Sequence, residues 1–223
     1  METLEKLLES PFKEVKKDDV IEIQNRCSKI AKKLFDNYGI KCGDKIFRFA
    51  EIEFYYYKKS EASKNNWDAE WNKETYPRNN DAGELFYHYS GVDICFQCHF
   101  EEKARDNDNG EFGGILIRSL LDGDKIIAGP LFCVNTILNT CNDKMPKLVQ
   151  DDQHTYKFEK DLRCGIDSDK KQEVGKELYL CYYATFVNGK ELQWDKASER
   201  IEWDKKNGKF KNKTRNYKNE RKF

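Results

Sequence analysis

One segment, KIFRFAEIEFYYY at Lys45–Tyr57, limits more than any other what this chain can fold into. It is dense in aromatic and β-branched residues and alternates with a period of two, which predicts a β-strand. Successive side chains of a strand point to opposite faces of the sheet. We therefore expect one face to carry Ile46, Ala50, Ile52 and Phe54, and the other to carry Glu51, Glu53, Tyr55 and Tyr57.

Two helices are predicted around this strand. The first covers residues 18–38, where apolar residues recur at helical spacing and Gly39 is placed to end the helix. The second covers residues 129–140 and begins at Gly129-Pro130, because proline is favoured in the first turn of a helix. We expect its buried face to consist of Leu131, Val134, Ile137 and Leu138.

Further strands are predicted over residues 85–89, 92–100, 114–121 and 177–187. Ser90-Gly91 and Asn188-Gly189 are tight-turn signals that join neighbouring antiparallel strands. The elements together predict a single α+β domain over residues 1–203, with a curved, mostly antiparallel sheet flanked by helices.

The C-terminal segment differs from the rest of the chain in charge. The 223 residues contain 40 basic and 40 acidic side chains, so the whole chain is formally neutral. Residues 204–223 nevertheless carry nine Lys and Arg against Asp204 and Glu220, a net charge of +7 that leaves −7 on residues 1–203. This tail has almost no apolar periodicity, so we expect it to be mobile.

The sequence also bears on compartment and assembly. No apolar run approaches the roughly 18–20 residues that span a bilayer, and the N-terminus has no secretory signal pattern. Eight cysteines are few for a disulfide scaffold of this length. We expect an intracellular, cytoplasmic or nucleoid-associated protein that is monomeric and does not contact membranes.

Cys95 and Cys98, followed by His99, resemble half of a zinc site. They lie in a predicted strand, where residues three apart face opposite sides, so they can share an ion only at a bulge. No second Cys pair completes four ligands, and we expect no structural metal. The chain also lacks a Gly-rich phosphate loop, a GxSxG elbow and a His-Glu helical zinc motif, which disfavours nucleotide hydrolases, serine esterases and metalloproteases.

The polar segment from Lys58 to Gly83 contains three large aromatic residues, Trp67, Trp71 and Tyr76. They either fold back onto the domain or line a surface used for binding.

Glu51 and Glu53 are unexpected within so apolar a strand, because a carboxylate is costly to remove from water. They must face solvent, pair with a base, or lie in a functional cleft. The simplest alternative is the exposed face of an edge strand. Arg118 is likewise flanked by apolar residues, within ILIRSLL, so the two charged strands together suggest a cleft with opposed charges.

The order of these motifs resembles that of the alkyladenine (3-methyladenine) DNA glycosylases. AEIEFYYY at Ala50–Tyr57 is similar to that family's glutamate-bearing strand, which reads E-T-E-A-Y. GILIRSL at Gly114–Leu120 is similar to its L-L-R-A-L. Four other segments match in the same order: Pro77-Arg78-Asn79, the two strands within Gly83–Gln97, Gly129-Pro130, and RCGI at Arg163–Ile166.

The resemblance implies a site and a reaction. Glu53 corresponds to the carboxylate that activates a water for attack on the sugar carbon, Arg118 to the active-site arginine, and Tyr55 to an aromatic wall of the base pocket. Such a reaction requires the base to be rotated out of the duplex. It uses no metal or organic cofactor.

The chain also departs from the family pattern. His88 stands where the family has a tyrosine that stacks on the flipped base, and the short turn Tyr89-Ser90-Gly91 replaces its wedge tyrosine. Gln97 replaces an asparagine, and residues 67–71 contain no counterpart of a loop histidine. His88 either contacts a base or is structural, and Asp93 either accepts a hydrogen bond near the pocket or caps the hairpin.

We therefore expect a divergent DNA glycosylase that hydrolyses the N-glycosidic bond of a modified purine in base excision repair. Its expected catalytic residues are Glu53 and Arg118, and its expected substrate-binding residues are Tyr55, His88, Asp93 and Gln97. DNA is the expected partner, with the basic tail on phosphates. The alternative is a non-catalytic module on the same fold that binds nucleic acid or protein through the aromatic loop and the tail.

Overall fold

The computed structural model describes residues 3–12, 15, 20–58, 75–99, 111–142, 144–151, 154–161, 163, 180–194, 199–204 and 209–214. Trp67 and Trp71 of the aromatic loop lie outside the described residues, as do residues 215–223 of the tail.

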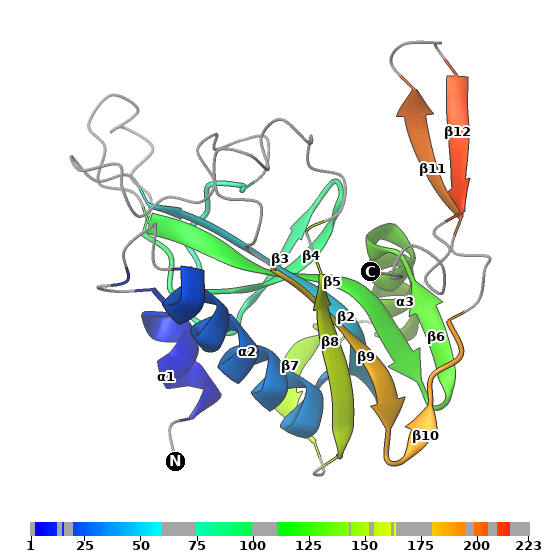
Figure 1. The fold of residues 1–223 in the computed structure, drawn as a ribbon, viewed down its shortest axis with the longest axis horizontal. Helices are drawn as coiled ribbons and strands as arrows, with labels where there is room; N and C mark the ends of the chain where they lie inside the picture. The colour runs from blue at the N-terminus through cyan, green and yellow to red at the C-terminus, as the bar shows by residue number, and fades with distance from the viewer. Residues whose placement is uncertain are drawn as a thin grey trace.

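The described part of the chain is built on a strongly curled antiparallel sheet of ten strands, which has the form of a half-barrel (Figure 1). Its central path runs β10-β9-β2-β5-β4-β3, with β1, β6, β7 and β8 paired alongside. The α+β class and the mostly antiparallel pairing are as expected. The strands are β1 (Tyr38–Cys42), β2 (Lys45–Lys58), β3 (Leu85–His88), β4 (Gly91–Cys95), β5 (Glu111–Asp122), β6 (Lys125–Ala128), β7 (Lys147–Gln150), β8 (Tyr156–Asp161), β9 (Cys181–Val187) and β10 (Lys190–Glu191).

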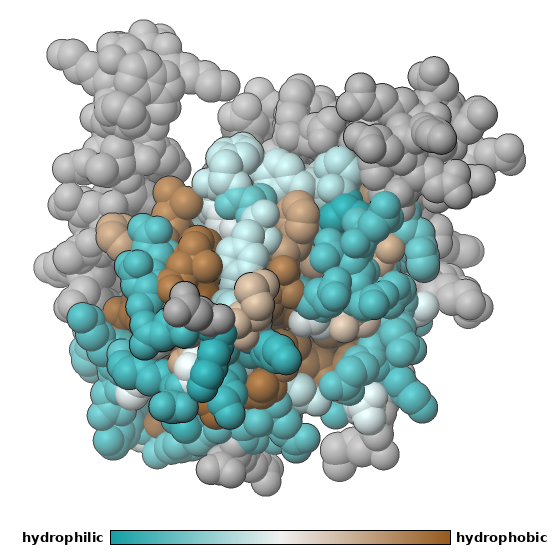
Figure 2. Space-filling view, turned by 180° about the vertical axis from the view of Figure 1, so that it is seen from behind, coloured by the Kyte–Doolittle hydropathy of each residue, from teal (hydrophilic) through white to brown (hydrophobic). Residues whose placement is uncertain are grey.

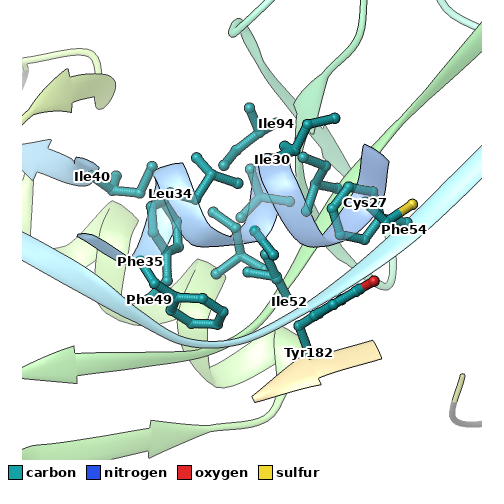
Figure 3. Close-up of a cluster of buried hydrophobic side chains, with 14 of the residues drawn as sticks. Cys27, Ile30, Leu34, Phe35, Ile40, Phe49, Ile52, Phe54, Ile94 and Tyr182 are labelled. Carbon is teal, nitrogen blue, oxygen red and sulfur yellow. The ribbon is translucent and has the colours of Figure 1, made fainter. Parts of the chain in front are cut away.

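The hydrophobic core lies between one face of this sheet and helix α2 (Val20–Asn37), with the short helix α1 (Leu4–Glu9) beside it (Figure 1). Figure 3 shows Ile30 and Leu34 of α2 pointing toward Ile52 of β2. The helical spacing of the apolar residues in α2 places them on one side, as the sequence predicts. Gly39 does not end this helix. It lies within β1, where an added Cβ would meet a side-chain atom of Ile46 at 2.5 Å.

The pairing of β2 with β5 has an irregularity in the middle of both strands. Ala50 of β2 and Arg118 of β5 each lack a partner in the β2–β5 ladder. From Ile52, which pairs with Ile117, the two strands pair with the same register as they do before the irregularity. Both strands therefore change face at the same level. The core face of β2 carries Phe47 and Phe49 before this point, and Ala50, Ile52, Phe54 and Tyr56 after it.

This change of face corrects one prediction. Ile46 lies before the irregularity, so it does not share a face with Ile52 and is exposed. The assignment of Glu51 and Glu53 to the opposite face from Ile52 is correct, because all three lie beyond it. The proposed edge position is wrong, since β2 lies between β5 and β9 in the sheet.

Helix α3 (Pro130–Thr140) begins with Pro130 as predicted, but its buried face differs from the expected one. Ile137 is buried and Val134 packs against the core, as predicted. Cys133, which was not predicted, is buried as well, whereas Leu131 and Leu138 are more than half exposed. Leu131 and Leu138 are seven residues apart and lie on the same side of the helix, away from the core. Together with exposed Phe132 they contribute hydrophobic surface on the α3 side of the molecule, visible in the view from behind (Figure 2).

The predicted hairpin turns are confirmed. β3 and β4 are joined by a hairpin whose turn is Tyr89-Ser90, one residue before the predicted Ser90-Gly91, because Gly91 already pairs with His88. β9 and β10 are joined by Asn188-Gly189 as predicted, and both of these residues have positive φ. The predicted strand 92–100 ends early, at Cys95, because the next amides bond elsewhere: the amide of Gln97 donates to the carbonyl of Leu8.

A separate two-stranded sheet is formed by β11 (Glu199–Asp204) and β12 (Lys209–Thr214). Part of the segment expected to be a mobile tail therefore has regular backbone pairing. Among the described residues, no helix has both the length and the apolar character required to span a membrane.

Candidate functional site

The sheet face opposite the core carries a buried array of polar side chains. The strand register brings it together: Leu116 of β5 pairs with Glu53 of β2 on one side and with Asp93 of β4 on the other. Cys181 of β9 pairs with Glu53 on the far side. Directly opposed residues of neighbouring strands point to the same face. Glu53 and Asp93 thus flank Leu116 in one row across the sheet, and each belongs to its own charged cluster.

Glu53 is at the centre of the first cluster. Its side chain has no exposed surface, and its Oε2 lies 3.0 Å from Nη1 of Arg118. Its Oε1 accepts a hydrogen bond from the hydroxyl of Tyr55, which lies two residues on along the same face of β2. Both carboxylate oxygens are therefore held by donors, which fixes the plane of the carboxylate.

Arg118 also reaches the other glutamate of β2. Its Nε lies 3.3 Å from Oε1 of Glu51, and Ser119 Oγ donates to Oε2 of the same carboxylate at 3.1 Å. Arg118 and Ser119 are consecutive, so in a regular strand they would point to opposite faces. The irregularity in β5 turns both toward Glu51. Cys181 Sγ completes this environment, 3.4 Å from Oε1 of Glu51.

Burial and the neighbouring charges shift the pKa values of the side chains in this cluster. Burial raises the pKa of Glu53 above its ordinary value, although Arg118 and the Tyr55 hydroxyl act in the opposite direction. Burial also raises the pKa of Tyr55, and the neighbouring Glu53 raises it further, so the phenol keeps its proton. Burial alone would lower the pKa of Arg118, but the two glutamates outweigh it, and the guanidinium stays charged.

Arg163 borders this cluster. Its Nη1 donates to the carbonyl of Phe54 at 3.4 Å, and its guanidinium carbon lies 4.9 Å from the centre of the Tyr55 ring. A cation over an aromatic face is attracted by the ring quadrupole. Two guanidinium groups therefore approach the Glu53–Tyr55 pair from different elements. Nη2 of Arg118 is buried and has no hydrogen-bond partner among the residues that the structure describes.

The second cluster is built on β3, β4 and the segment before them. Arg78 Nη1 lies 2.7 Å from Oδ2 of Asp93, and His88 Nε2 lies 3.1 Å from Oδ1 of the same carboxylate. The Arg78 guanidinium lies 4.2 Å from the centre of the Phe86 ring and passes over Gly114, where an added Cβ would be 3.2 Å from Nη1. Burial acts to raise the pKa of Asp93, but Arg78 and His88 hold it below its ordinary value.

The remaining predicted site residue lies apart from both clusters. The Gln97 side chain bonds to Asp81 Oδ1 at 3.1 Å and accepts from the amide of Ala82 at 3.3 Å, so it fastens the segment before β3. The structure thus brings Glu53, Arg118 and Tyr55 together, and separately His88 and Asp93.

The Cys95–Cys98 prediction needs a correction in geometry. The two thiols do not face opposite sides but lie close enough to interact, which raises the pKa of Cys95 and lowers that of Cys98. The strand ends at Cys95, so the alternation of side chains stops there. Both cysteines are buried. Within the part of the chain that the structure describes, no group of three or more His, Cys, Asp or Glu has the arrangement of a metal site.

Several members of the two clusters were not singled out from the sequence. Ser119 and Cys181 lie in apolar strands and carry no sequence signal, since only the pairing of β2 with β5 and β9 brings them to Glu51. Arg78 and Arg163 belong to the segments Pro77-Arg78-Asn79 and RCGI, so the ordered resemblance marked their positions without giving them a role.

Comparison of the chain with models of known protein families, with curated proteins and with solved structures finds no match. The arrangement of the side chains therefore carries the functional argument. A buried carboxylate with a raised pKa, fixed by a guanidinium and a phenol, is suited to accept a proton from water and to stabilise a cationic carbon.

Proposed function

We propose that this protein hydrolyses the N-glycosidic bond of a modified purine nucleotide, with Glu53 as the base that activates water. The observation that carries the proposal is the Glu53–Arg118 pair: a fully buried carboxylate 3.0 Å from a guanidinium on the non-core face of an interior strand. Replacing a buried ion pair with apolar residues is often neutral or stabilising, so its presence needs a reason other than stability. Perturbed, buried titratable groups cluster at functional sites.

The chemistry requires one carboxylate in the ionised state. As the bond between the sugar and the base breaks, its electron pair leaves with the base nitrogen and positive charge develops on the sugar carbon. Glu53 stabilises that charge and accepts a proton from the attacking water, whose oxygen forms the new bond to the same carbon. The products are the free base and a sugar that carries a hydroxyl group.

Arg118 and Tyr55 have supporting roles in this proposal. Arg118 lowers the pKa of Glu53 and so favours the ionised form, against the larger opposing effect of burial. Within the described residues Nη2 of Arg118 has no hydrogen-bond partner, so it is available to an oxygen of the sugar or phosphate. Tyr55 donates to Glu53 and presents its ring to the substrate. We propose a modified purine in DNA as the substrate because the motifs of this chain resemble, in the same order, those of the alkyladenine DNA glycosylases. The proposal includes a preference of the protein for this substrate over other N-glycosides.

Glu53 has no exposed surface in this structure, so a substrate reaches it only after the covering side chains move. The alternative of a non-catalytic binding module predicted an exposed Glu53 on an edge strand. The interior position of β2 and the burial of Glu53 argue against that edge-strand arrangement. A single cleft shared by Glu53, Arg118 and His88 would favour catalysis, but His88 bonds to Asp93 in the second cluster, so the binding module stays an alternative.

The test compares two variants that remove one carboxylate each from the same strand face. Glu53→Gln keeps the shape and one acceptor but cannot take a proton, whereas Glu51→Gln alters the carboxylate that Arg118 contacts through Nε. Release of free base from methylated DNA and from deoxyinosine-containing DNA would be followed by chromatography. We expect Glu53→Gln to lose about 100-fold or more in single-turnover rate, as for the loss of a general base, and Glu51→Gln to lose much less.

Circular dichroism of both variants provides the control for folding. Base release by wild type that persists at full rate in folded Glu53→Gln would refute the role of Glu53. Absence of base release from every modified and unmodified oligonucleotide in wild type would refute the proposed reaction.

A further inference from the structure

The turn between β3 and β4 carries a chain of hydrogen bonds that the proposed glycosidic reaction does not use. Ser90 Oγ lies 2.9 Å from Nδ1 of His88, and Nε2 of the same ring lies 3.1 Å from Oδ1 of Asp93. The Tyr76 hydroxyl lies 3.4 Å from Ser90 Oγ, at the other end. A serine, a histidine and an aspartate are thus connected in the order that activates a hydroxyl nucleophile.

The charge of Asp93 determines the direction of each bond. Arg78 lies 2.7 Å from Asp93, so the carboxylate is ionised and can only accept. In the neutral form of His88 the hydrogen is therefore on Nε2, which leaves Nδ1 as an acceptor for the Ser90 hydroxyl. With its own hydrogen directed to His88, Ser90 Oγ accepts from Tyr76. The tautomer and the ring orientation of His88 both follow from this arrangement.

We propose that Ser90 is a nucleophile that cleaves small acyl esters, with His88 as its base and Asp93 as the group that orients His88. This activity is separate from the proposed hydrolysis of N-glycosidic bonds and does not involve Glu53 or Arg118. Serine–histidine–aspartate sites are recognised by geometry and by the roles of the groups, independent of fold and of chain order.

The surroundings of Ser90 meet the other requirements of such a site. Ser90 lies at the tip of the β3–β4 hairpin and is itself half-buried, beside Tyr89, which is 80% exposed. The side chains of His88 and Asp93 are no more than 8% exposed, so in this proposal a small ester approaches Ser90 from the side of Tyr89. Burial raises the pKa of Tyr76 to about 12, so its hydroxyl remains a donor. In this proposal that donor, 3.4 Å from Ser90 Oγ, turns to the negative oxygen of the tetrahedral intermediate, which lies two bonds from Oγ.

The reaction balances with water as the second substrate. Ser90 Oγ bonds to the acyl carbon while its proton moves to His88 Nδ1, and the alcohol departs with that proton. A water then attacks the acyl carbon, its proton passes through His88 to Ser90 Oγ, and the carboxylic acid is released. Arg78 shares the charge of Asp93, which reduces the stabilisation of the His88 cation, so we expect slow turnover.

The experiment uses a fluorophosphonate probe, in which a serine oxygen displaces fluoride, followed by peptide mapping of the intact chain. Ser10, an exposed residue after α1, serves as an internal reference. We expect the adduct on Ser90 to form roughly 100-fold faster than on Ser10, and its rate to fall by a similar factor in His88→Gln, because both differences reflect general-base assistance. Hydrolysis of p-nitrophenyl acetate should be lost in Ser90→Ala.

Two outcomes overturn the proposal: Ser90 unlabelled in the folded wild type, or labelling of Ser90 at an unchanged rate in His88→Gln. The wild-type mapping decides the question even if a variant does not fold. Glu53→Gln separates the two activities, since it should keep the Ser90 adduct and lose base release.

Discussion

Nη1 of Arg118 lies 3.0 Å from Oε2 of Glu53 inside the sheet, and neither side chain is more than 3% exposed. The same guanidinium reaches Glu51 through Nε at 3.3 Å, so one cation contacts two buried carboxyl groups. Such an arrangement costs desolvation energy that a surface ion pair does not. The balance between that cost and the attraction within the cluster makes the stability of the fold depend on pH.

The first prediction concerns the pH dependence of stability in Glu53→Gln. The pKa of Glu53 is raised in the folded protein above its ordinary value of 4.5, so folding favours the protonated form. The stability that wild type gains from protonated Glu53 is fully present below pH 4.5, the ordinary pKa of the group. This stability is lost as the pH rises through the pKa of Glu53 in the folded protein. The variant lacks this titration. We therefore expect the free energy of unfolding of wild type minus that of the variant to decrease from pH 4.5 toward neutrality, by about 1.4 kcal/mol per unit of pKa shift.

Urea denaturation at several pH values measures this difference. Glu191→Gln, on exposed strand β10, is the matched control and should show no comparable trend. A difference that increases with pH would mean that Arg118 and Tyr55 outweigh burial and that the pKa of Glu53 is lowered.

The second prediction concerns Asp93→Asn, which leaves the buried Arg78 guanidinium without its counter-ion. Loss of one partner of a buried ion pair costs about 3–5 kcal/mol. We expect a loss of that size in the free energy of unfolding at pH 7. Because the pKa of Asp93 is held below 3.8, the difference from wild type should shrink only as the pH falls below that value.

Asp124→Asn provides the control for Asp93. Asp124 contacts Lys190 at 3.3 Å, but both side chains are at least 75% exposed, so we expect a change below about 1 kcal/mol. Equal effects of the two substitutions in urea titrations would argue that the Arg78–Asp93 pair has little role in stability.

The third prediction uses two consecutive residues of α3. Ile137 is buried in the core, whereas its neighbour Leu138 is 54% exposed. Ile137→Ala should lower the free energy of unfolding by about 2–5 kcal/mol through loss of packing, and Leu138→Ala should change it by about 0.5 kcal/mol or less. Thermal or urea unfolding of the two variants tests which face of the helix packs on the core, and a larger effect at Leu138 would contradict the assigned face.

Much of the fold follows from local patterns in the sequence. β2, the turn at Asn188-Gly189 and the start of α3 at Pro130 were predictable, because periodicity, turn residues and proline act within a few positions. The proximity of Glu53 and Arg118 was suggested by two charges in apolar strands. Ile46 was assigned to the wrong face, because the change of face in β2 depends on its pairing with β5.

The missed members of the two clusters share a cause. Ser119 contacts Glu51 only because an irregularity turns two consecutive side chains to one face. Ser90 contacts His88, and His88 contacts Asp93, only once the β3–β4 hairpin is formed. The face of α3 was misjudged for a similar reason, because Leu131 and Leu138 fit a helical apolar stripe as well as Cys133 and Ile137 do. Which stripe is buried depends on the rest of the fold.

The paired irregularity at Ala50 and Arg118 has a consequence for how the length of this chain can vary among relatives. A one-residue deletion in β2 alone would shift the ladder and turn its remaining core residues outward, unless β5 lost a residue at the same level. Insertions and deletions in these two strands should therefore occur together, and any relative that lacks the residue at position 50 should also lack the arginine at 118.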